Sequence, residues 1–63
     1  MTNEEKYEMN VRTMISYEEM IERIERRIER GWNPEREEEL ISRIARYEET
    51  ILRIAGENIA LNA

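Results

Sequence analysis

The chain has 63 residues, of which 40% are charged and 6% aromatic, and its net charge is −5. It contains no cysteine and no histidine, which excludes disulfides, thiolate metal sites and the usual nucleophile–base triads. We therefore expect a protein that is not an enzyme and that takes no cofactor, metal or small molecule. A chain this short buries little surface by itself, so association with another chain is expected.

The composition also indicates the fold class. All fifteen acidic residues are glutamate, which suits helix interiors, and there are only two glycines and one proline. No apolar run approaches the roughly 18–20 residues that span a bilayer, and the N-terminus lacks the apolar stretch of a secretory signal. We expect a cytoplasmic, all-α protein that forms one domain over residues 1–63 and does not contact a membrane.

The first helix is expected over about residues 3–30. Thr2 and Glu5 have the spacing of a capping box at its start. Gly31 suits the left-handed residue that closes a helix, and Arg30 lies favourably beside the negative end of the helix dipole. Seven residues with alternating spacings of three and four form one seam along this helix: Tyr7, Asn10, Met14, Tyr17, Ile21, Ile24 and Ile28.

A turn is expected at residues 31–33 and a second helix at about 34–61. Asn33 and Pro34 have the character of an N-cap and a first helical residue. Gly56 predicts a weak point at which this helix kinks or frays. The second seam has the same spacing as the first: Leu40, Ile44, Tyr47, Ile51, Ile54, Asn58 and Leu61.

Folding the chain back at the turn predicts an antiparallel helical hairpin with coiled-coil-like packing. In this register the numbers of two facing seam residues always add up to the same value, and Asn10 faces Asn58. A buried asparagine pair fixes register at some cost in stability. The alternative is that both asparagines lie in water near frayed helix ends.

Basic residues gather along one edge of the predicted hairpin, which we call the basic edge. It holds eight of the ten basic residues: Lys6, Arg23, Arg27, Arg30, Arg36, Arg43, Arg46 and Arg53. The opposite edge holds seven glutamates and no basic residue: Glu8, Glu18, Glu22, Glu25, Glu29, Glu38 and Glu48. One interpretation is that solvated charges are sorted by chance, and the other is that a partner supplies the complementary charge.

The residues predicted to bind a partner are six arginines of the basic edge and the tryptophan of the turn: Arg23, Arg27, Arg30, Trp32, Arg36, Arg43 and Arg46. Tryptophan is over-represented at interface hot spots, so Trp32 is a candidate anchor. The alternative for Trp32 is a cap over the hydrophobic residues at the end of the core.

A second apolar stripe runs beside the seam on the acidic side, and we call it the apolar face. It comprises Val11, Ile15, Ile41, Ala45, Leu52, Ala55 and Ile59. Two stripes make an apolar surface wider than a two-helix seam can cover. The sequence therefore predicts a homodimer in which two hairpins pair through this face into a four-helix bundle. Higher oligomers and hetero-complexes are the alternatives.

In length and predicted architecture the chain resembles the plasmid Rop proteins, which are dimers of helical hairpins that bind RNA loop pairs. Met1, Thr2, Glu5, Lys6 and Asn10 match the way that family begins. The resemblance implies RNA binding by the arginines of the basic edge. One feature departs from it: Asn10, whose counterpart faces RNA in that family, lies in the predicted seam. Separately, the basic edge lacks aromatic residues that stack on bases, which weakens the recognition of single strands.

The leading hypothesis is a small protein–protein interaction module, a dimeric regulator, adaptor or inhibitor of a larger protein. A Rop-like RNA-binding hairpin is the first alternative. The second is a structural self-assembly module, in which the basic edge of one hairpin meets the acidic edge of the next.

Overall fold

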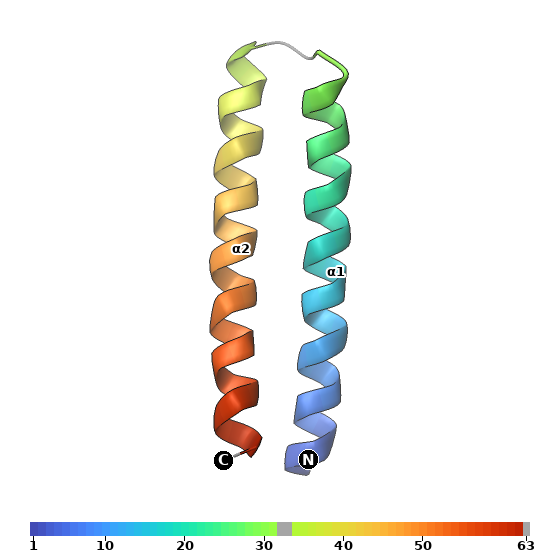
Figure 1. Ribbon diagram of the computed structural model, residues 1–63, viewed down its shortest axis with the longest axis vertical. Helices are drawn as coiled ribbons and strands as arrows, with labels where there is room; N and C mark the ends of the chain where they lie inside the picture. Colours follow the sequence, from blue (N-terminus) through green and yellow to red (C-terminus); the bar gives the residue numbers. More distant parts are fainter. Residues whose placement is uncertain (32–33, 63) are drawn as a thin grey trace.

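The computed structural model describes residues 1–31 and 34–62. It contains two helices, α1 (Asn3–Glu29) and α2 (Pro34–Asn62), which lie antiparallel and side by side so that both chain ends are at the same end (Figure 1). The molecule measures 45 × 14 × 14 Å. The predicted all-α hairpin is therefore confirmed. The pairing of two hairpins into a bundle stays a prediction.

Helix α1 begins with the predicted cap. Thr2 is extended, with φ −78° and ψ 164°, and its hydroxyl oxygen accepts the backbone N–H of Glu5 at 3.1 Å. The same hydroxyl donates to the Glu5 carboxylate, also at 3.1 Å. Because the first N–H groups of a helix have no partner within it, this contact satisfies one of them and fixes where the helix starts.

Gly31 closes α1 as the sequence predicts. Its φ of 77° lies in the left-handed region, and its N–H donates to the carbonyl of Ile28 at 3.2 Å. Helix α1 ends at Glu29, one residue earlier than expected, and α2 starts at the expected Pro34. The predicted cap Asn33 and the predicted anchor Trp32 lie outside the described residues.

Helix α2 continues without a break through Gly56 to Asn62, so the predicted fraying is wrong. A glycine inside a helix costs only about 1 kcal/mol relative to alanine. Seam residues on either side of it hold the helix to α1: Ile54 is half-buried and Asn58 is 6% exposed. These tertiary contacts outweigh the local preference of one residue.

The core of the hairpin is thin. Among residues 1–31 and 34–62 the buried residues are Ile21, Ile24, Leu40 and Asn58, and all four belong to the predicted seams. Every other predicted seam residue is half-buried except Tyr7, which is 38% exposed. Within residues 1–31 and 34–62 no side chain is fully enclosed. Two helices alone cannot surround a side chain, so the seam remains open to solvent along both edges.

One hydrogen bond establishes the register of the two helices. The side-chain amide of Asn10 donates to the side-chain oxygen of Asn58 at 2.8 Å, across 48 positions of the sequence. The predicted facing of these two residues is confirmed, and the alternative of two frayed, solvated asparagines is wrong. In the described part of the chain no buried side-chain nitrogen or oxygen lacks a hydrogen-bond partner.

Tyr17 and Tyr47 make a contact that the sequence did not predict. Their ring centroids lie 5.3 Å apart with an angle of 44° between the ring planes. The two residues belong to neighbouring layers of the seam, so they meet diagonally, which long aromatic side chains can do. Neither helix has, over the described residues, a stretch long and apolar enough to cross a membrane.

Candidate functional site

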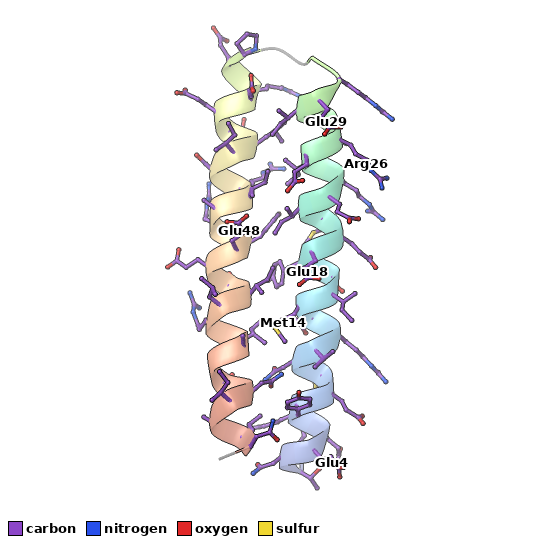
Figure 2. The ribbon with its side chains drawn as sticks, viewed as in Figure 1. Glu4, Met14, Glu18, Arg26, Glu29 and Glu48 are labelled. Atoms are coloured by element: carbon purple, nitrogen blue, oxygen red, sulfur yellow. The ribbon has the colours of Figure 1, made fainter. Side chains whose placement is uncertain are left out.

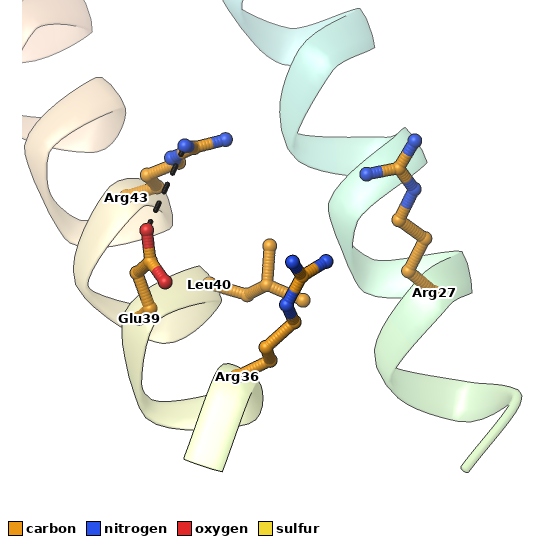
Figure 3. A pocket seen from close by; sticks show the side chains of 5 residues that line it. All are labelled: Arg27, Arg36, Glu39, Leu40 and Arg43. Carbon is orange, nitrogen blue, oxygen red and sulfur yellow. Dashed lines mark ion pairs between the residues drawn. The ribbon is translucent and has the colours of Figure 1, made fainter. Parts of the chain in front are cut away.

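Arginines from both helices surround a cavity on the basic edge near the turn. Arg27 reaches it from α1, and Arg36, Glu39, Leu40 and Arg43 reach it from α2 (Figure 3). The cavity has a volume of about 150 Å³, and Leu40, which is 8% exposed, lies between the two helices at its floor. The folded hairpin therefore brings Arg27, Arg36 and Arg43 together from two distant parts of the sequence.

A second cavity of about 160 Å³ adjoins the first, since Arg27 and Arg43 line both. Its other lining residues are Met20, Arg23, Ile24 and Tyr47. We refer to the two cavities together as the basic groove. Its walls carry four arginines and one glutamate, while its floor is made of the buried Ile24 and Leu40 and the half-buried Met20 and Tyr47.

An ion pair lies within the basic groove. Glu39 pairs with Arg43 at 3.8 Å, one helical turn away, and both side chains are at least half exposed. Exposed pairs of this kind contribute little to stability. Like charges that approach one another from two helices repel mildly in solvent. Positive charge over an apolar floor is suited to binding an anionic partner that carries apolar groups.

The other three predicted partner-binding residues are Arg30, Arg46 and Trp32, and the first two are not among the described residues that line the basic groove. Arg30 and Arg46 are exposed, and their place on the basic edge stays a prediction of the heptad pattern. Trp32 lies outside the described residues, so its two alternatives, cap or anchor, stay open. The groove also has five lining residues that the sequence did not predict as partner-binding: Met20, Ile24, Glu39, Leu40 and Tyr47. The flank positions of the basic edge hold no aromatic residue, but Tyr47 of the seam borders the groove beside them.

The apolar face is largely uncovered. Leu52 and Ile59 are 73% and 74% exposed, and Ile15 and Ile41 are about half exposed. Val11 and Ala55 are half-buried against the seam, and Ala45 is exposed. Exposed leucine and isoleucine residues that share one face indicate a surface that associates with another apolar surface.

Glutamates divide the apolar face into two parts. Val11, Ile15, Leu52, Ala55 and Ile59 lie in the half of the hairpin that holds the chain ends, and we call them the open-end patch. Ile41 and Ala45 lie nearer the turn, beyond Glu18 and Glu48, which Figure 2 shows on the same face of the two helices.

The open-end patch borders a hollow between the helices. A cavity of about 240 Å³ is lined by Val11, Ala55 and Ile59 of the patch and by four neighbours: Tyr7, Met14, Asn58 and Asn62. Met14 lies between the two helices in Figure 2. The patch therefore has projecting side chains next to a cavity. Helices pack by placing the side-chain ridges of one helix into the grooves of another, and this surface offers both.

Potential metal ligands do not converge in the described part of the chain. No three acidic, histidine or cysteine side chains within residues 1–31 and 34–62 are placed to hold a metal ion. The hydroxyl of Ser16 donates to the carbonyl of Arg12 at 3.1 Å on its own helix. The expectation that the protein is not an enzyme stays a prediction.

Comparison with known proteins gives no relative: no protein-family model, no curated protein and no solved structure matches this chain.

Proposed function

We propose that this chain is a small protein–protein interaction module that acts as a dimer. Two hairpins associate through the apolar face into a four-helix bundle, and the basic edge of each binds a larger protein as a regulator, adaptor or inhibitor. The protein is proposed to work by occupying a surface of its partner and not by chemistry on a substrate.

The area of exposed surface is the observation that supports association. The chain exposes 5281 Å², whereas a compact monomer of 7.7 kDa is expected to expose about 4,300 Å². The excess of roughly 1,000 Å² is close to the area of about 800 Å² that each partner contributes to a stable protein–protein interface. A second copy placed on the open-end patch would cover its most exposed residues, Leu52 and Ile59.

The charge distribution supports a separate surface for the partner. The open-end patch lies on the acidic side of the hairpin and the basic groove on the opposite side. Pairing through the patch therefore leaves both copies of the groove accessible. A dimer presenting two identical grooves would bind a partner with two matching sites more strongly than one hairpin would.

A capture experiment with matched variants tests the proposed partner binding. Tagged wild-type chain, an Arg27→Gln/Arg43→Gln variant and an Arg12→Gln/Arg26→Gln variant are incubated with nuclease-treated lysate of the source cells. Both variants lose two positive charges, but Arg12 and Arg26 lie outside the basic edge. We expect one protein to be retained by the wild type and the control and to be lost from the groove variant. Equal retention by all three would contradict binding by the groove.

RNA binding is a second candidate, because the groove gathers arginines from both helices as a contact with a phosphate backbone requires. The same capture without nuclease tests it. Retained RNA that is released between about 50 and 200 mM salt would favour this function over protein binding.

A further inference from the structure

We infer that the basic groove binds an acidic helical segment of a partner protein, in which carboxylates flank an aliphatic side chain. This inference rests on the proposed function and adds to it the chemistry of the partner. It depends on two properties of the groove that occur together: cationic walls supplied by both helices and an apolar floor between them.

The walls are suited to carboxylates. Arg27 and Arg43 line both cavities of the groove, Arg36 lines the first and Arg23 the second (Figure 3 shows the first cavity). Arginine binds carboxylates with two parallel hydrogen bonds. The seven residues from Arg36 to Arg43 correspond to about 10 Å along the helix, which is also the distance between two glutamates seven residues apart on a helix laid alongside. A helical segment can therefore meet both ends of the groove with one face.

The floor distinguishes this partner from a polyanion. Ile24 and Leu40 are 7% and 8% exposed at the base of the groove, and Met20 and Tyr47 extend that base. A phosphate backbone would leave this apolar surface without a partner, whereas a leucine between two glutamates would cover it. The strongly acidic opposite edge and the net charge of −5 also disfavour a long polyanion more than a short segment.

Charge complementarity also predicts how binding responds to temperature and salt. Arg27 of α1 lies opposite Arg36 and Arg43 of α2, and Glu39 is the acidic residue among the five that line the first cavity. Carboxylates from a partner would be attracted by arginines of both helices. Binding is therefore expected to raise the melting temperature of the hairpin and to weaken as salt increases.

The test uses a fluorescent helical peptide of about 15 residues, long enough to be partly helical, with glutamates seven residues apart and a leucine between them. Fluorescence polarisation measures its affinity for the full chain. We expect binding by the wild type and by Arg12→Gln/Arg26→Gln, and binding about tenfold or more weaker for Arg27→Gln/Arg43→Gln. A peptide with serine in place of the leucine is expected to bind about fivefold to tenfold more weakly, because it leaves the floor uncovered.

Each contrary result overturns the inference. Equal affinity for the leucine and serine peptides would show that charge alone is recognised, and tighter binding of a short RNA hairpin than of the peptide would assign the groove to nucleic acid. Self-association that Arg27→Gln/Arg43→Gln abolishes would assign it to the acidic edge of another copy. Dimer formation, followed in parallel by sedimentation, reports on the apolar face, so failure of the peptide to bind is distinguishable from failure of the proposed dimer.

Discussion

Asn10 and Asn58 specify how far one helix slides along the other. Their hydrogen bond of 2.8 Å is made in a site where Asn58 is almost completely buried. Shifting one helix by a turn would bury an amide opposite an aliphatic side chain, which is unfavourable. The pair is therefore expected to favour one register of the two helices over the others and to add little to the free energy of unfolding. Buried polar residues do the same in coiled coils.

Substitutions at this pair should be strongly non-additive. Asn58→Leu alone leaves the Asn10 amide facing an apolar group and is expected to destabilise the hairpin by about 1–2 kcal/mol. Asn10→Leu/Asn58→Leu replaces both amides, so it should raise the melting temperature above that of the wild type and loosen the register or oligomeric state. Thermal melts followed by circular dichroism measure the first effect and sedimentation the second. A double variant with unchanged register and oligomeric state would contradict the role in alignment.

The two glycines should respond in opposite ways to the same substitution. A Cβ added at Gly56 meets no atom within 4 Å, and this residue lies inside α2, so Gly56→Ala is expected to stabilise by about 1 kcal/mol. Gly31 has the same open space but a φ of 77°, so Gly31→Ala is expected to destabilise by about 1 kcal/mol. Urea unfolding compares the two variants. Stabilisation by Gly31→Ala would show that the turn does not require the left-handed conformation.

At the scale of the helices, much of the arrangement follows from the sequence. The 3-4 spacing predicted both seams, and one turn with Gly31 and Pro34 allowed a single way to fold the chain back. Facing pairs such as Asn10 and Asn58 could then be assigned by number alone. The charged edges were also predictable, because heptad positions place Arg27 and Arg43 on the same side of the seam.

The heptad pattern could not predict contacts that depend on the length of a side chain. Tyr17 and Tyr47 meet across layers, and Tyr47 borders the basic groove as well as the seam. A pattern assigns each residue to one position, whereas a long aromatic side chain contacts several. Gly56 was misjudged for a different reason, since local propensity takes no account of the seam contacts that hold α2 together.

The two charged edges predict how the hairpin responds to salt. Like charges face each other along both edges, so raising salt from about 20 to 500 mM should increase the melting temperature by a few degrees. Arg27→Glu places an acid opposite Arg36 and Arg43 and should both raise the melting temperature and reduce this dependence. Arg26→Glu is the control, because Arg26 points away from the hairpin (Figure 2) and follows Glu22 by one turn. If Arg26→Glu were equally stabilising, net charge and not the facing arginines would explain the effect.

For the whole molecule, the elongated shape limits how much surface is buried. A rod of 45 × 14 × 14 Å exposes most of each residue that its seam does not use, and no described side chain is fully enclosed. Such a hairpin has little stability of its own. Association through the open-end patch would supply the missing burial, and it would place the two basic grooves on the outside of the assembly.

Sedimentation equilibrium over a dilution series is the most direct test of this association. The wild-type chain is expected to sediment at twice its mass of 7.7 kDa at micromolar concentration. Leu52→Glu, which places a charge in the open-end patch at a residue 73% exposed in the single hairpin, should shift the mass to that of one chain. A wild-type protein that remains folded as a single chain throughout the series would contradict the proposed dimer.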